Sequence, residues 1–214
     1  MRTLPRLVAV TDDRRLEADD FPERLEALLG AGLPAVWLRA KELPAGEFYA
    51  RALLARAATK AYGVELWIGD RADVAALVGA ERLHVPERGL PHPAARRIVG
   101  EGPAIGRSVH GIEAAVRAAS EGADHLVVGA IFRTASHPGV EPAGPGRLTA
   151  VRDAIAGPGQ PPAIFAVGGI EPDRVADVRG AGADGVVALR ALWEAPSPRE
   201  AVDRYLAALE GPPR

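Results

Sequence analysis

The sequence of 214 residues contains no cysteine. This excludes disulfides, thiolate-bound metals and a cysteine nucleophile, and it suits a protein of the reducing cytoplasm, where we expect this chain to work. Lysine is nearly absent as well, because Lys41 and Lys60 are the only two and almost all positive charge is arginine. A lysine that occurs beside an apolar strand, as Lys41 does, is therefore a candidate for a functional role rather than for surface charge.

Long apolar runs and a strong net charge are also missing. No run approaches the roughly 18 apolar residues of a membrane-spanning helix, and the apolar stretch at 7–10 is too short for a signal peptide. The formal net charge of −2 lacks the excess of positive charge that binds nucleic acid or an acidic membrane. We therefore expect neither as a partner. A content of 48% hydrophobic and 25% charged residues is typical of a globular protein with a sizeable core.

One pattern recurs along the chain: Gly-Ala, one or two polar residues, and an apolar run rich in β-forming residues. It is found at 30–40, 79–85, 122–132 and 180–190. A helix-period segment precedes each copy, and glycine at a helix end followed by a short connection is typical of the turn from helix to strand. Further candidate strands lie at 7–12, 65–70, 104–110 and 163–170.

These eight expected strands alternate with helical segments, which predicts a parallel sheet. Eight such units in a chain of this length indicate a (β/α)8 barrel, and we expect residues 1–214 to form one barrel domain. A doubly wound sheet is the alternative fold, but it would not need eight units. No linker or change of composition marks a second domain.

Two adjacent glycines, Gly168 and Gly169, end the seventh expected strand. A glycine pair at this place indicates close backbone approach or an unusual dihedral angle, so a tight turn and an anion resting on bare N–H groups are both possible. Barrel active sites lie at the C-terminal strand ends, and phosphate commonly binds the loops after strands seven and eight. The location favours a phosphate-bearing ligand held by Gly168, Gly169 and the Leu189–Arg190 segment.

Polar side chains gather at the other expected strand ends. Arg39 and Lys41 share one face of the second strand, where two cations favour an anionic substrate group over a merely solvated strand exit. The further candidates are Thr11, Asp12, Asp70, Glu87, Ser108, His110, Thr134, Ser136 and His137.

His110 is the candidate best suited to proton transfer, because an ordinary histidine pKa lies near pH 7. A hydrogen-bonded structural histidine is the alternative. His84 and His125 lie within strands or at their start, where structural roles are more common. The histidine and carboxylate spacings of a dedicated metal site are missing, so we expect no resident metal.

Five motifs follow one another in a characteristic order: VWLRAK (36–41), IGDRADVAALVGAERLHV (68–85), GRSVHGIEAA (106–115), VGAIFRTASHPG (128–139) and FAVGGI (165–170). Together they resemble the thiamine phosphate synthase/TenI family of small barrels over nearly the whole chain. Synthases of that family join a hydroxymethylpyrimidine pyrophosphate to a thiazole phosphate with the help of Mg²⁺. TenI-type members aromatise a carboxythiazole phosphate tautomer by moving a proton, without a metal. Both types bind the thiazole phosphate at the loops after strands seven and eight.

The sequence departs from the synthase pattern at four positions. They are Trp37 for glutamine, Gly69 for asparagine, Gly89 for the second metal-binding aspartate, and His137 for lysine. Asp70 keeps the first metal position, and Glu87 lies near the lost one without aligning with it. All four changes fall on the half of the site that holds metal, pyrophosphate and pyrimidine.

The resemblance therefore implies a thiazole tautomerase without a cofactor, in which His110 moves the proton and Arg39 or Lys41 neutralises the carboxylate. Asp70, Ser108, Thr134, Ser136, His137, Gly168, Gly169, Leu189 and Arg190 are the remaining predicted contacts to a phosphorylated thiazole. The alternatives are a Mg²⁺-dependent synthase with a degraded metal site and a non-catalytic phosphate-binding barrel. A homo-oligomer is compatible with either activity.

Overall fold

The computed structural model describes residues 4–134, 139, 141–157 and 159–212. Within them, eight parallel strands close into a barrel in sequence order, with β8 paired back to β1. The strands are β1 (Leu7–Val10), β2 (Ala35–Leu38), β3 (Glu65–Gly69), β4 (Arg82–Val85), β5 (Ala104–Val109), β6 (His125–Val128), β7 (Ala163–Val167) and β8 (Gly185–Ala188). The expected (β/α)8 barrel is confirmed.

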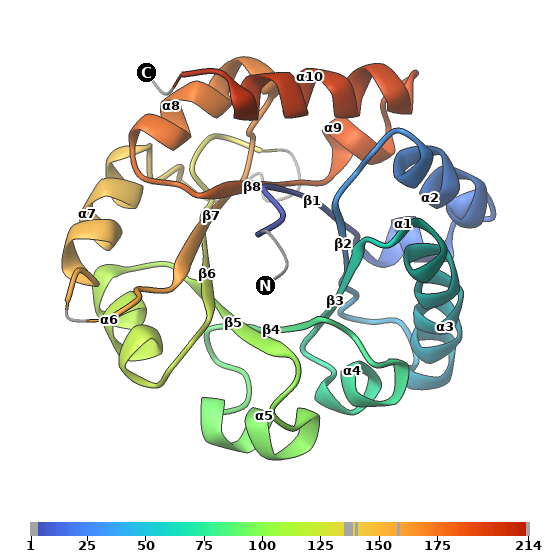
Figure 1. The fold of residues 1–214 in the computed structure, drawn as a ribbon, viewed down its shortest axis with the longest axis horizontal. Helices are drawn as coiled ribbons and strands as arrows, with labels where there is room; N and C mark the ends of the chain where they lie inside the picture. The colour runs from blue at the N-terminus through green and yellow to red at the C-terminus, as the bar shows by residue number, and fades with distance from the viewer. Residues whose placement is uncertain (1–3, 135–138, 140, 158, 213–214) are drawn as a thin grey trace.

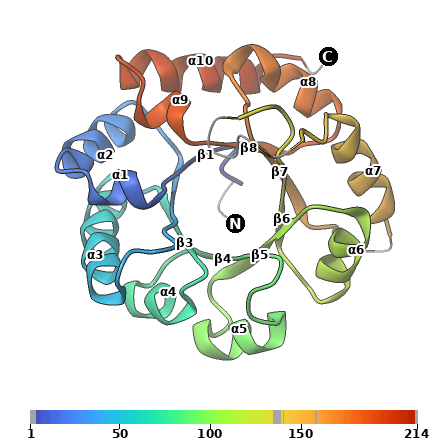
Figure 2. The same cartoon turned by 180° about the vertical axis from the view of Figure 1, so that it is seen from behind.

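Helices surround the strands as a ring, which is visible from both sides (Figure 1, Figure 2). They are α1 (Asp13–Glu17), α2 (Phe21–Gly30), α3 (Ala45–Tyr62), α4 (Ala72–Val78), α5 (His92–Val99), α6 (Ile112–Ser120), α7 (Gly146–Ala154), the 3-10 helix η1 (Pro172–Arg174), α8 (Val175–Gly180), α9 (Arg190–Trp193) and α10 (Pro198–Glu210). Helix α10 lies along the outside of α8 and α9 (Figure 1). Among the described residues, no helix has both the length and the apolar character needed to cross a membrane.

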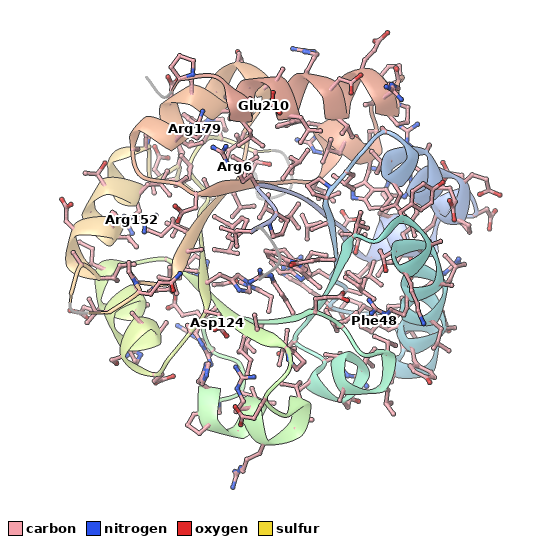
Figure 3. The ribbon with its side chains drawn as sticks, viewed as in Figure 1. Arg6, Phe48, Asp124, Arg152, Arg179 and Glu210 are labelled. Carbon is pink, nitrogen blue, oxygen red and sulfur yellow. The ribbon has the colours of Figure 1, made fainter. Side chains whose placement is uncertain are left out.

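Side chains fill the inside of the barrel (Figure 3). Large rings are prominent among them. Trp67 and Phe165 lie edge to face with their ring centroids 5.2 Å apart, and His125 is 4.6 Å from Trp67. Glycines on neighbouring strands make room for these rings. A Cβ atom on Gly106 would lie 2.0 Å from Nε2 of His125, and one on Gly185 would lie 2.6 Å from Phe165. Wide side chains therefore fit in the barrel only because glycines lie beside them.

The polar position of the Gly-Ala repeat has a structural role at three of the turns. An acid at the start of an even-numbered strand accepts the N–H of a residue on the preceding strand and pairs with an arginine from a helix. The three sets are Glu81 with Leu66 and Arg56, Asp124 with Ile105 and Arg96, and Asp184 with Ile164 and Arg152. Figure 3 labels Asp124 and Arg152. These pairs lie at the N-terminal end of the barrel, the end that carries stability rather than catalysis.

Glu81→Ala should lower the free energy of unfolding by about 2–3 kcal/mol, because the Leu66 N–H and the Arg56 guanidinium both lose their acceptor. Urea denaturation measures this effect. The exposed Glu121→Ala variant is the matched control and should change stability by about 0.5 kcal/mol or less.

The effect of Glu81→Ala should also depend on pH. Burial acts to raise the pKa of Glu81, but hydrogen bonds from Arg56 and the Leu66 amide outweigh it and lower the pKa. The stabilisation is therefore present above the ordinary glutamate pKa and is lost as the pH falls through the lower value of the folded state. The difference between parent and variant should shrink below about pH 4. An equal difference at low and neutral pH would contradict this account.

Candidate functional site

A cavity of about 270 Å³ opens at the C-terminal end of the barrel. It brings together predicted site residues from five of the strand ends, namely Arg39, Ser108, His110, Thr134, Gly168, Gly169, Leu189 and Arg190. Val10, Thr11, Trp37, Val127, Val187 and Glu171 contribute further lining. The cavity thus combines two guanidinium groups, hydroxyl groups, an imidazole and a glycine turn in one small volume.

Four predicted contacts are not part of this lining. Lys41 and Asp70 are exposed outside the cavity, and Ser136 and His137 lie outside the described residues. The loop that carries Lys41 is held by Asp13, whose Oδ1 accepts the backbone N–H of Lys41 at 2.9 Å and those of two following residues. Burial acts to raise the pKa of Asp13, but these amides outweigh it and lower the pKa.

The glycine pair after β7 forms a tight turn that lines the cavity. Gly168 and Gly169 have φ angles of 99° and 63°, which side-chain-bearing residues rarely adopt. A Cβ on Gly169 would also lie 2.4 Å from the carbonyl oxygen of Arg133, so the turn packs tightly against the segment after β6. Within the described residues, no backbone acceptor pairs with the Gly169 N–H. The turn is therefore structurally required, and an anion bound by its amide groups stays a prediction.

A carboxylate orients His110. The Oε2 atom of Glu87 accepts the backbone N–H of His110 at 2.8 Å and lies 2.8 Å from its Nδ1. Burial acts to raise the pKa of Glu87, but the hydrogen bonds from His110 outweigh it and lower the pKa. An ionised carboxylate can only accept, so Nδ1 carries the proton and Nε2 is the basic nitrogen. Glu87 and His110 come from different loops, and the sequence placed Glu87 only near the lost metal aspartate.

Two of the four departures from the synthase pattern, Trp37 and Gly69, pack directly against each other. Trp37 is 5% exposed, and its ring centroid lies 4.3 Å from that of His84. A Cβ on Gly69 would lie 2.9 Å from Nε1 of Trp37 and 3.2 Å from the Leu38 carbonyl oxygen. The indole therefore requires a glycine at position 69. Trp37 thus lines the cavity with an indole where the family motif has a glutamine, and Gly69 makes room for that indole.

The residues present retain only one of the two carboxylates in the Mg²⁺ site of the family pattern. A Cβ on Gly89 would lie 3.2 Å from Oδ1 of Asp70, so the two positions are adjacent, as a pair of metal-binding aspartates requires. The same Cβ would lie only 2.6 Å from Val85, so a side chain at position 89 would need the loop to move. Among the described residues, no group of three histidines or carboxylates could hold a metal. A Mg²⁺ ion at Asp70 would therefore depend on the phosphates of a substrate for its other anionic oxygens.

Comparisons with known proteins agree with the resemblance. The model of a family described as thiamine monophosphate synthase, TMP-TENI, matches residues 7–192. A putative thiamine-phosphate synthase of Geobacter sulfurreducens is 36% identical over 209 residues, which cover 97% of this chain and 95% of the relative. The thiamine-phosphate synthase of Thermobifida fusca is 38% identical, over 88% of this chain and 85% of the relative.

A solved structure shows the same similarity. The thiamine phosphate pyrophosphorylase from Pyrococcus furiosus superposes with a TM-score of 0.82 at 28% identity, and the match covers 96% of both chains.

The coupling of Trp37 and Gly69 predicts a non-additive response. Gly69→Asn alone should destabilise the protein by about 1–3 kcal/mol, because the new side chain overlaps the indole. Combined with Trp37→Gln, the same change should cost at least about 1 kcal/mol less than the sum of the single variants. Denaturant titration of the four proteins measures the coupling. Gly102→Asn, at a glycine with open space around it, is the control, and strict additivity would contradict the packing argument.

Proposed function

Because this chain belongs to the thiamine-phosphate synthase (TMP-TENI) family of thiamine biosynthesis, we propose that it is a TenI-type thiazole tautomerase formed by one barrel domain over residues 1–214. The observation that carries the proposal is the position of Glu87. This carboxylate, two residues before the position of the lost metal aspartate in the sequence, is hydrogen-bonded to His110 beside the cavity. The site thus contains an oriented base, whereas its metal-binding half is incomplete.

The substrate would be a carboxythiazole phosphate in its non-aromatic form. Its phosphate would bind at the Gly168–Gly169 turn and at the Leu189–Arg190 segment, where backbone N–H groups and a cation meet. Arg39 lines the cavity and would neutralise the carboxylate, and Lys41, which lies outside the lining, remains a predicted contact. Ser108 and Thr134 would supply hydrogen bonds. Asp70, Ser136 and His137 remain predicted contacts.

The reaction moves one proton. Nε2 of His110 would take it from a saturated ring carbon, and the released electron pair would complete the aromatic system of the thiazole. The proton would then return to another carbon of the conjugated system, so that no atom is gained or lost. Glu87 would hold Nδ1–H throughout and stabilise the charged imidazole between the two steps. Because aromatisation is downhill, a single well-placed base is sufficient.

Four further features belong to the same proposal. The chemistry requires no cofactor, and we expect neither nucleic acid nor membrane as a partner. The cysteine-free composition supports a cytoplasmic location. A homo-oligomer stays compatible with a site that lies within one chain.

The relatives favour a second candidate, the Mg²⁺-dependent synthase. The Geobacter and Thermobifida proteins are named as synthases, and the Pyrococcus structure as a pyrophosphorylase. The geometry weighs against this activity here. The wall formed by Trp37 and Gly69 and the crowded position of Gly89 alter the half of the site that the synthase motif uses for pyrimidine, pyrophosphate and metal.

An assay of the synthase reaction separates the two candidates. With Mg²⁺, hydroxymethylpyrimidine pyrophosphate and thiazole phosphate, the purified protein should release no pyrophosphate above background, because the metal site lacks a carboxylate. A well-characterised synthase run in parallel controls the assay. Turnover at a rate usual for enzymes, about 1 per second or more, would overturn the tautomerase proposal.

Substitution of His110 separates a catalyst from a binding barrel. His110→Asn should slow conversion of the tautomer to the aromatic carboxythiazole by about 100-fold or more, because the base is lost. Its affinity for thiazole phosphate should change by no more than about threefold, a free-energy change below 1 kcal/mol. Glu87→Gln should slow the reaction by about tenfold, whereas Glu113→Gln, an exposed control on α6, should not.

Ultraviolet absorbance after mixing follows the conversion, and the uncatalysed isomerisation is subtracted. If His110→Asn matches the parent rate, His110 has a structural role. If the parent itself does not exceed the background, the protein is a binder and the catalytic proposal is wrong.

A further inference from the structure

A chain of polar groups runs through the otherwise apolar inside of the barrel. Nδ1 of His84 lies 3.2 Å from Nε2 of His125, and Nε2 of His84 lies 2.9 Å from Oγ of Ser108. Both histidines are buried, at 1% and 0% exposure. Ser108, by contrast, lines the cavity together with His110. These hydrogen-bonded side chains therefore link the barrel core to the wall of the site.

Both imidazoles are neutral at working pH. Burial, reinforced by the positive charges of Arg39 and Arg107, lowers the pKa of His84 to about 3. Burial also lowers the pKa of His125 well below its ordinary value. Each ring therefore carries one N–H, and the chain of three groups has one proton on each member.

Only two arrangements of these protons make both hydrogen bonds. In the first, His125 donates from Nε2 to His84, and His84 donates from Nε2 to Ser108. In the second, every bond is reversed: Ser108 donates to His84, His84 donates from Nδ1 to His125, and the proton of His125 is on Nδ1. The two arrangements differ in what Ser108 offers to the cavity.

The surroundings of His125 distinguish the two arrangements. Among the described residues, Nδ1 of His125 has no hydrogen-bond partner, and the ring lies against Trp67 and Phe165. The second arrangement would leave an N–H donor unpaired among these rings, and the first leaves only a lone pair. Unpaired buried N–H groups are the rarer of the two in folded proteins.

We propose that the His125–His84 pair fixes the Ser108 hydroxyl as a hydrogen-bond donor into the cavity, so that this wall selects an anionic oxygen of the ligand. Because Ser108 accepts from His84, its own O–H is free to donate to the ligand. The proposal rests on the proposed function for the identity of that oxygen, which would be the carboxylate, since the phosphate is assigned to the glycine turn. His84 and His125 are then positioning residues, which act through Ser108.

Nitrogen-15 NMR of the imidazole rings tests the proton arrangement without any ligand. The five histidines are assigned by single replacements of His92, His110 and His137, which leave the buried pair intact. We expect neutral rings protonated at Nε2 for both His84 and His125 at pH 7. A ring protonated at Nδ1 for either residue, or a charged ring, would overturn the proposal.

Calorimetry then tests the selectivity with two probes, thiazole phosphate with and without its carboxylate. Ser108→Ala and His84→Phe, which keeps a ring against Trp37, should each weaken binding of the carboxylated probe by about tenfold. Binding of the other probe should stay within about twofold, a change of less than 0.5 kcal/mol. His84→Phe should have no further effect in the Ser108→Ala background, and His92→Phe is the control substitution.

Equal losses for both probes, or additive losses in the double variant, would overturn the selectivity. Failure of the parent protein to bind either probe would instead contradict the thiazole proposal, and the NMR result would still decide the direction of the Ser108 hydroxyl. If His84→Phe does not fold, His84→Gln replaces it, because its amide can donate to Ser108 and should preserve the selectivity.

Discussion

The packed interior of the barrel is the constraint on which the rest of the structure depends. Trp37, Trp67 and Phe165 fill it together with two histidines, and they fit because glycines lie beside them on neighbouring strands. A closed barrel of eight strands has just enough internal space for side chains. Each large ring therefore limits the size of the residues beside it on neighbouring strands. Of these rings, Trp37 also lines the cavity.

This constraint links stability to specificity. Trp37 contributes to the packed interior and also to the cavity wall. The side chains packed in the barrel interior therefore hold this wall in place. Ser108 is similarly supported from the interior by His84. Groups positioned by a packed second layer keep their geometry when a ligand arrives, whereas groups on loops must first be ordered. In this barrel the walls at Trp37 and Ser108 are therefore fixed before a ligand arrives.

The sequence predicted the fold and the strand ends that meet, because the Gly-Ala repeat has a clear period and a parallel barrel gathers its C-terminal ends. It also identified His110, Ser108 and the glycine pair as neighbours. It did not predict the pairing of Glu87 with His110 or that of Trp37 with Gly69. These depend on side-chain directions in two separate segments, which no local pattern encodes. The acids of the Gly-Ala repeat were recognised as polar positions, but their partners lie on distant helices.

The position of Glu87 connects the lost metal site with the proposed base. The Oε2 atom of Glu87 accepts both the backbone N–H and the side chain of His110, which leaves Oε1 as the oxygen that could bind a cation. A cation at Oε1 would draw negative charge away from the carboxylate and so weaken its hydrogen bond to the imidazole. Orientation of His110 and ligation of a metal by Glu87 therefore oppose each other. Together with the glycine at position 89, the hydrogen bond between Glu87 and His110 favours the proposed proton transfer over the stabilisation of a departing pyrophosphate.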